Sequence, residues 1–340
     1  MGVAQDTVDT LGELHYFPSA AATFKYVLHP RLSLSLAEAF TRSDEPALAN
    51  QFGLKTQRST FDSNQLGVSA DWLIDVFATQ VYYQSSVFSG QSNTASQIAG
   101  ADVGFPLGKV MALRGGYEFL YSTTTGSTTS DGGSLQTTGH LGWGSIARQI
   151  SPLRTVGVQG SYSIQLLNNT RIWNASVFSA LELPGRLSMS GSVGYGVLTA
   201  DSGEFSTMTS HTSVSYQLAP AVISLAADSD FSQTFLQGEN FGITLTRSYT
   251  AAIDYALTPT LHARARGSYS ENEFTGVGNT TSRPDQRTIT GSAVLGWQLR
   301  PWLKMAIDYT YTRYYTGPGF LGGTGTITEN RAAFRLDTLF

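Results

Sequence analysis

The sequence contains no cysteine, which excludes disulfides and is compatible with an oxidising envelope compartment. Charge is also scarce. Only 14% of the 340 residues are charged, although 41% are hydrophobic, whereas an average soluble domain has about 25% charged residues. Serine, threonine, glycine, asparagine and glutamine take the place of the missing charge. This composition argues against a cytosolic α/β enzyme. Plentiful aromatic residues and a net charge of −4 argue against disorder.

Long hydrophobic runs are absent as well. No segment supplies the roughly 18 apolar residues that a transmembrane helix needs. The start lacks a basic region and an apolar region, so no intact signal peptide is present. Gly2, Val3 and Ala4 fit the small-residue end of a cleavage site. We interpret residues 1–4 as the remnant of a removed leader, with an ordinary start as the alternative, and residues 1–340 as a single domain.

What the chain does contain is strict alternation of apolar and polar residues. The pattern is clearest in residues 111–121, 155–166, 289–299 and 303–312. A period of two is typical of strands with one apolar and one polar face. No comparable stretch shows apolar residues at the spacing of a helix, so we expect no helix.

The predicted strands are paired around very short turns, most of which carry proline. A turn without proline is expected near Asp71 and Trp72. Longer polar or glycine-rich stretches, such as those beginning at Thr123 and Gly317, separate the pairs. The proline turns are His29-Pro30-Arg31, Pro106-Leu107-Gly108, Ser151-Pro152-Leu153, Leu183-Pro184-Gly185, Ala219-Pro220, Thr258-Pro259 and Arg300-Pro301-Trp302.

Short turns at one end and long loops at the other are typical of outer-membrane barrels. We therefore predict an all-β fold, a closed antiparallel transmembrane β-barrel with short periplasmic turns and longer extracellular loops. The turn count predicts about 18 strands if one strand lies within residues 3–14, and 16 if none does. A water-soluble propeller or β-helix is the alternative. Long strands, and aromatic residues at both strand ends, such as Trp72 and Tyr311, favour the membrane barrel.

The polar faces of these strands would line the lumen with charges of both signs. Folding the hairpins predicts cross-strand pairs of Asp254 with Arg264, Asp102 with Arg114, and Asp308 with Arg335. These charges either keep the lumen wet and fix register, or form an eyelet that orients a solute. The loop from Ser43 to Asp62 is the predicted constriction. The predicted pore-lining residues are Asp102, Arg114, Glu118, His140, His211, Asp228, Asp254, Arg264, Arg266, Lys304, Asp308, Arg335 and Asp337.

Signals for catalysis are weak. No Gly-x-Ser-x-Gly elbow, His-x-x-x-His pair or metal-spaced acidic cluster is present. His140 and His211 are expected to be isolated lining residues. We therefore predict neither an enzyme nor a site for metal, cofactor or nucleic acid.

The end of the chain carries a family resemblance. Residues 308–313, the following glycine-rich loop and residues 328–340 resemble the last hairpin of β-barrel porins encoded beside exopolysaccharide export clusters in Gram-negative bacteria. Arg331 and Phe340 are the most specific matches. Phe340, with Phe334 and Leu336 at alternate positions, also resembles the signal read by the barrel-assembly machinery.

The resemblance implies an integral protein of the bacterial outer membrane that acts as a passive conduit for secreted exopolysaccharide. A general diffusion porin and a non-conducting structural or adhesive barrel are the alternatives. Expected partners are outer-membrane lipid and lipopolysaccharide, the barrel-assembly machinery, and periplasmic or inner-membrane export proteins. The residues alone specify neither the substrate, the direction of transport, nor the oligomeric state.

Overall fold

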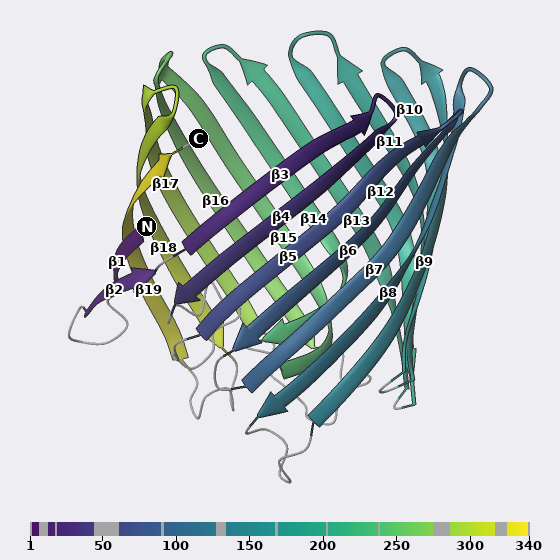
Figure 1. The fold of residues 1–340 in the computed structure, drawn as a ribbon, viewed down its shortest axis with the longest axis horizontal. Coiled ribbons are helices and arrows are strands. Elements are labelled where there is room, and N and C mark those ends of the chain that lie inside the picture. The colour runs from purple at the N-terminus through teal and green to yellow at the C-terminus, as the bar shows by residue number, and fades with distance from the viewer. Residues whose placement is uncertain are drawn as a thin grey trace.

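Seventeen antiparallel strands form the main sheet of the protein (Figure 1), as seen in a computed structural model. The structure describes residues 2–6, 13–17, 19–43, 61–89, 92–126, 134–166, 169–201, 203–236, 239–274, 286–316 and 325–338. Within these ranges there is no helix, and hence none long and apolar enough to cross a membrane. The all-β prediction is confirmed.

The main-sheet strands follow one another in chain order. Consecutive strands from β3 to β19 pair antiparallel, and the strand order, with β3 following β19, is that of a closed barrel. The strands are β3 (Ser19–His29), β4 (Leu32–Ser43), β5 (Phe61–Ile74), β6 (Phe77–Ser89), β7 (Ser92–Leu107), β8 (Met111–Gly126), β9 (Ser134–Ser151), β10 (Arg154–Gln165), β11 (Thr170–Leu183), β12 (Leu187–Ala200), β13 (Gly203–Leu218), β14 (Ala221–Leu236), β15 (Glu239–Thr258), β16 (Leu261–Phe274), β17 (Gln286–Arg300), β18 (Leu303–Thr316) and β19 (Gly325–Thr338).

Two further strands form a small hairpin beside the main sheet. β1 (Gly2–Asp6) pairs antiparallel with β2 (Glu13–Phe17), and β1 also lies against β19. The main sheet therefore has seventeen described strands, and the predicted count of 18 or 16 is not confirmed. A strand does occur near the predicted N-terminal position, but it belongs to this separate hairpin.

Short turns join the strands at one end of the barrel, which we call the turn side. Six lie at predicted proline positions, one lies at residues 108–110 directly after β7, which contains Pro106, and one lies at Asp75-Val76, a few residues beyond the predicted turn near Trp72. Asp75 has a positive φ of 54°, a conformation that aspartate tolerates better than most residues.

The opposite end, which we call the loop side, is less uniform than predicted. The connection after β4 is long, spanning residues 44–60, but β6–β7, β12–β13 and β14–β15 are joined by only residues 90–91, 201–202 and 237–238. Polar stretches there continue as strands because their backbones pair with a neighbour.

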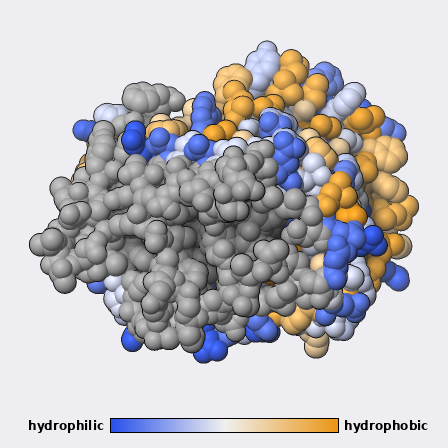
Figure 2. All heavy atoms as spheres, turned by 90° about the horizontal axis from the view of Figure 1, so that it is seen from below, coloured by the Kyte–Doolittle hydropathy of each residue, from blue (hydrophilic) through white to orange (hydrophobic). Residues whose placement is uncertain are grey.

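The main sheet is apolar on its outer face. Phe24, Val177 and Ile307 expose 61%, 60% and 58% of their surface, and the alternation places them opposite the polar face. Figure 2, seen from the loop side, shows hydrophobic side chains along the upper and right-hand wall. This arrangement suits a barrel whose outer wall meets lipid.

Candidate functional site: the lumen

The polar face of the sheet places most of the predicted lining residues together. Residues opposite one another in an antiparallel register share a face, and the registers pair Asp254 with Arg264 and Lys304 with Asp337. Because side chains alternate between the two faces along each strand, these pairs also fix the face on which the remaining side chains lie. The residues on this luminal face are Asp102, Arg114, Glu118, His211, Asp228, Asp254, Arg264, Arg266, Lys304, Asp308, Arg335 and, by register, Asp337.

His140 lies on the opposite, outer face, so its predicted place in the pore is wrong. Its Nδ1 atom is 2.5 Å from the Tyr117 hydroxyl oxygen, and its ring packs 5.3 Å from that of Phe119. Both aromatic residues belong to the apolar face of β8. On β9 it is Leu141 and Trp143 that face the lumen.

Two of the three predicted cross-strand ion pairs are present. Asp254 accepts a hydrogen bond from Arg264 Nε, and Asp308 Oδ2 accepts one from Arg335 Nε at 3.0 Å. Asp308 is the more enclosed, with 12% of its side chain exposed. The third pair is not formed: among the described side chains, no ion pair joins Asp102 to Arg114, because Arg114 lies opposite Gly104 in the register.

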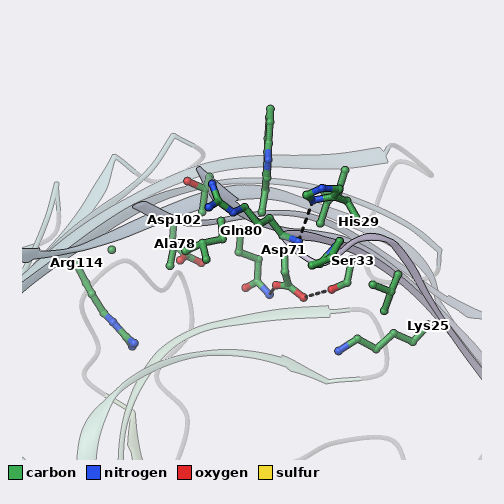
Figure 3. Close-up of a pocket in the computed structure, with 16 residues that line it drawn as sticks. Lys25, His29, Ser33, Asp71, Ala78, Gln80, Asp102 and Arg114 are labelled. Carbon is green, nitrogen blue, oxygen red and sulfur yellow. Dashed lines mark hydrogen bonds between the residues drawn. The ribbon is translucent and has the colours of Figure 1, made fainter. Parts of the chain in front are cut away.

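Asp102 and Arg114 instead line a hollow of about 480 Å³ at the turn side of the lumen (Figure 3). Asp71 lies in the same hollow and accepts hydrogen bonds from Gln80 Nε2 at 2.7 Å and Ser33 Oγ at 3.4 Å. Sequence reasoning missed Asp71 because it placed a turn there. The strand in fact continues to Ile74.

The loop-side half of the lumen is narrowed by the hairpin of β14 and β15. β13 and β14 pair from Leu218 and Ala221 only as far as Ser210 and Ser229. Beyond that point β13 continues to pair with β12, while β14 pairs only with β15 among the described strands. These strand ends therefore leave the wall. We call residues 230–236 and 239–245 the inward hairpin.

The outer face of the inward hairpin packs on the luminal face of β12 and β13. Phe231 lies 6.0 Å from Phe205, edge to face, and a Cβ on Gly196 would come within 2.8 Å of its ring. Ile243 and Leu198 are almost completely buried in the same cluster. The absence of a side chain at Gly196 thus permits the close approach of the hairpin.

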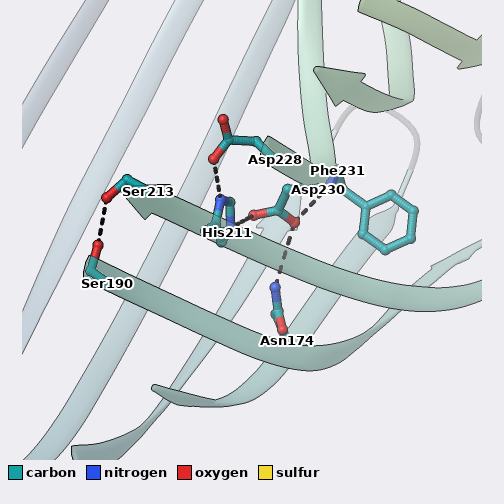
Figure 4. A network of polar contacts seen from close by, with 7 residues as sticks. All are labelled: Asn174, Ser190, His211, Ser213, Asp228, Asp230 and Phe231. Atoms are coloured by element: carbon teal, nitrogen blue, oxygen red, sulfur yellow. Dashed lines mark hydrogen bonds and ion pairs between the residues drawn. The ribbon is translucent and has the colours of Figure 1, made fainter. Parts of the chain in front are cut away.

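A polar clasp holds the base of the inward hairpin (Figure 4). His211 lies between two carboxylates, with Nδ1 3.2 Å from Asp228 and Nε2 3.1 Å from Asp230. Asp230 also accepts a hydrogen bond from Asn174 at 3.5 Å, and Asn174 accepts one from Thr209 at 3.1 Å. The signal in the sequence was the pair of aspartates two residues apart, which share one face of a strand.

Burial increases toward the loop side. Arg114, Arg264 and Lys304, nearer the turn side, are exposed to the lumen. Luminal residues toward the other end are nearly inaccessible: Ser122, Thr170, Thr209, Thr244, Asn272 and Thr288. The described luminal side chains are therefore accessible at the turn side and enclosed toward the loop side. In the part of the chain that the structure describes, no group of three or more potential metal-binding side chains forms a site.

Comparison with known proteins agrees with this architecture. A family model described as "Putative beta-barrel porin 2" matches residues 181–317, which include the inward hairpin. The fold resembles the FrpB iron transporter of Neisseria meningitidis, with a TM-score of 0.60 and 8% identity over 100% of this chain and 67% of that one. The chain has the fold of an outer-membrane β-barrel.

Two further structures have the same type of fold. The siderophore receptor PirA of Pseudomonas aeruginosa aligns with a TM-score of 0.53 and 7% identity, over 97% of this chain and 72% of that one. The copper transporter OprC aligns with a TM-score of 0.54 and 11% identity, over 100% of this chain and 64% of the OprC chain. Identities this low support the fold alone. No curated protein sequence matches the chain.

Proposed function

We propose that this protein is an outer-membrane channel and, specifically, a passive conduit for a secreted exopolysaccharide. The observation that carries the proposal is the chemistry of the lumen. Its wall offers hydroxyl and amide groups, and charges such as Asp254 and Asp308 are matched by arginines across the strands. A neutral sugar polymer can hydrogen-bond to such a wall without facing a strong field of either sign.

A second candidate is a general diffusion porin for small solutes. The inward hairpin favours this function because it narrows the lumen, and narrowing selects against long or bulky solutes. The two candidates differ in the largest sugar that crosses the barrel.

We also propose that the closed wall contains eighteen strands. β3 and β19 run in the same direction, since sixteen reversals separate them in the strand order. β1 runs opposite to β2 and lies against β19. Placed between β19 and the segment formed by β2 and β3, it would complete an all-antiparallel barrel with the even strand number of bacterial outer-membrane proteins. The turn side would then face the periplasm.

The partners proposed for this conduit follow from its location. Outer-membrane lipid and lipopolysaccharide would surround the wall, the barrel-assembly machinery would insert it, and periplasmic or inner-membrane export proteins would feed it. The barrel itself would perform no chemistry and would hold no cofactor.

Two measurements test the proposal. A strain that lacks the protein should retain polysaccharide in the periplasm, and secretion at the normal level would contradict the exporter function. Purified protein in liposomes should admit sugars, with uptake measured against oligomer length. Uptake of monosaccharides alone favours the porin, whereas absence of both uptake and ion conductance contradicts both channel functions.

A further inference from the structure

A row of side chains crosses the luminal wall beside the polar clasp. The registers place Phe178 opposite Ser192, Ser192 opposite His211, and His211 opposite Asp228, on four consecutive strands from β11 to β14. The row therefore begins with an aromatic ring and ends with a carboxylate.

This row lines a hollow of about 370 Å³. The floor consists of small residues, among them Ser190, Ser192 and Ala226, so the hollow lies between two taller walls. Phe178 forms one wall, and His211 with Asp228 forms the other. The volume is at the lower end of the range for small-molecule sites, which is about 300–1,000 Å³.

The ring of Phe178 rests on the backbone of β10. The nearest side-chain atoms to a Cβ built on Gly157 would be ring atoms of Phe178, so the ring occupies the space that a side chain would fill. Phe178 remains partly exposed. An aromatic ring held against the wall in this way offers an apolar surface on which a flat ligand can pack.

The opposite wall supplies hydrogen-bond acceptors. One oxygen of Asp228 meets His211 Nδ1, while the other points away from the histidine in Figure 4 and makes no hydrogen bond with any described side chain. Ser190 and Ser213 lie 2.7 Å apart, oxygen to oxygen, on the floor. One hydroxyl of that pair donates to the other, which leaves a donor and acceptors for a ligand.

We infer that this hollow is a subsite for a neutral pyranose ring. The inference rests on the proposed conduit function and names the chemistry of the solute at one place in the lumen. The apolar face of the sugar would pack on Phe178, and its hydroxyls would donate to Asp228 and exchange hydrogen bonds with Ser190 and Ser213. Asp228 and Asp230 disfavour an anionic sugar, because two carboxylates lie beside the hollow.

The location links the subsite to transport. His211 belongs both to the hollow and to the clasp of the inward hairpin, so a bound sugar would lie next to the part of the lumen that this hairpin narrows. One ring of a passing chain would therefore be oriented as it enters that part.

Current recordings with purified protein in planar bilayers test the subsite, with maltohexaose and cellohexaose as probes. Both sugars should interrupt the ion current in the wild type. Phe178→Leu should raise the dissociation constant for block about two- to thirteenfold, since an aromatic contact contributes about 0.5–1.5 kcal/mol. Phe178→Tyr keeps the ring and should block as the wild type does. Trp143→Leu, which removes another luminal aromatic outside the hollow, should also leave blocking unchanged.

Unchanged blocking in Phe178→Leu, or an equal loss in Trp143→Leu, would overturn the subsite. So would a conducting wild type that neither sugar blocks, while the secretion test would still decide the conduit separately. If the wild type does not conduct, titration calorimetry of the detergent-solubilised protein with the same sugars decides the subsite, and absence of heat in both wild type and Phe178→Leu contradicts it.

Discussion

Asn174 on β11 donates a hydrogen bond to Asp230 on β14 at 3.5 Å, although two strands lie between them in the sheet. Neighbouring strands are separated by about 4.8 Å, so residues three strands apart in a flat wall could not meet. The contact is possible only because β14 has left the wall and crosses over β12 and β13. This one hydrogen bond defines where the lumen begins to narrow.

Loosening the inward hairpin should widen the pore. Phe231→Ala removes the ring that packs against Phe205 and over Gly196, at a cost of about 1.5–3 kcal/mol of burial. Single-channel conductance should rise, and larger sugars should enter liposomes. Phe24→Ala, on the exposed outer face, serves as the control and should conduct like the wild type. Unchanged conductance in Phe231→Ala would mean that the hairpin does not limit the flow.

Fixing the hairpin should have the opposite effect. The chain contains no cysteine, so Asn174→Cys with Asp230→Cys creates a single reactive pair. A short bifunctional maleimide should join the two and hold conductance at or below the wild-type level, as seen by a gel shift together with current recordings. Asn174→Cys with Asp254→Cys is the control pair and should not be joined. If the first pair is not cross-linked under conditions in which each cysteine is labelled on its own, the clasp is contradicted.

The luminal ion pairs should contribute little to stability. Asp254 and Arg264 expose 42% and 62% of their side chains, and a double-mutant cycle of Asp254→Asn and Arg264→Gln should give a coupling of about 0.2–1 kcal/mol. Unfolding in urea from lipid vesicles measures it. The same cycle for Asp102 and Arg114, which form no pair, should give a coupling near zero. Equal couplings in the two cycles would contradict the pairing seen here.

The closing strand should depend on its outer face. Phe334 and Leu336 are about half exposed on that face of β19, and arginine facing lipid costs about 2–4 kcal/mol at mid-membrane and less near the interfaces. Phe334→Arg should therefore reduce folding into lipid vesicles, whereas Lys304→Leu, on the exposed luminal face of the neighbouring β18, should fold normally.

The terminal aromatic, Phe340, lies outside the described residues, and its role as an assembly signal stays a prediction. Its deletion should lower the amount of protein assembled in cells, measured by heat-modifiable migration, while the channels that do assemble conduct normally. Assembly at the wild-type level would contradict that role.

The sequence predicted the strands and their turns well because a period of two and prolines in tight turns are local properties. It failed for His140 for an equally local reason. Around it the glycines Gly139, Gly142 and Gly144 carry no side chain to mark a face, while Leu141 and Trp143 face the lumen, so the apolar and luminal faces of this strand were exchanged.

The inward hairpin could not be predicted in the same way. Phe231 and Leu245 have the same alternation as residues that face lipid, and they lie opposite each other in the register. Alternation states which face of a strand is apolar, but not whether that face meets lipid or the inside of the same barrel. The two environments, lipid and barrel interior, are distinguished only by where β13 and β14 stop pairing, at Ser210 and Ser229. That point depends on two strands together and cannot be read from either one alone.

The departure of β14 has a consequence for the wall itself. A closed sheet has no edges, but residues 203–209 of β13 pair with β12 alone among the described strands. Their outward backbone amides should exchange hydrogen for deuterium faster than those of residues 210–218, which are held on both sides. Residues 203–209 therefore form a short edge on the loop side of the barrel, and we expect this edge to open more readily than the rest of the wall.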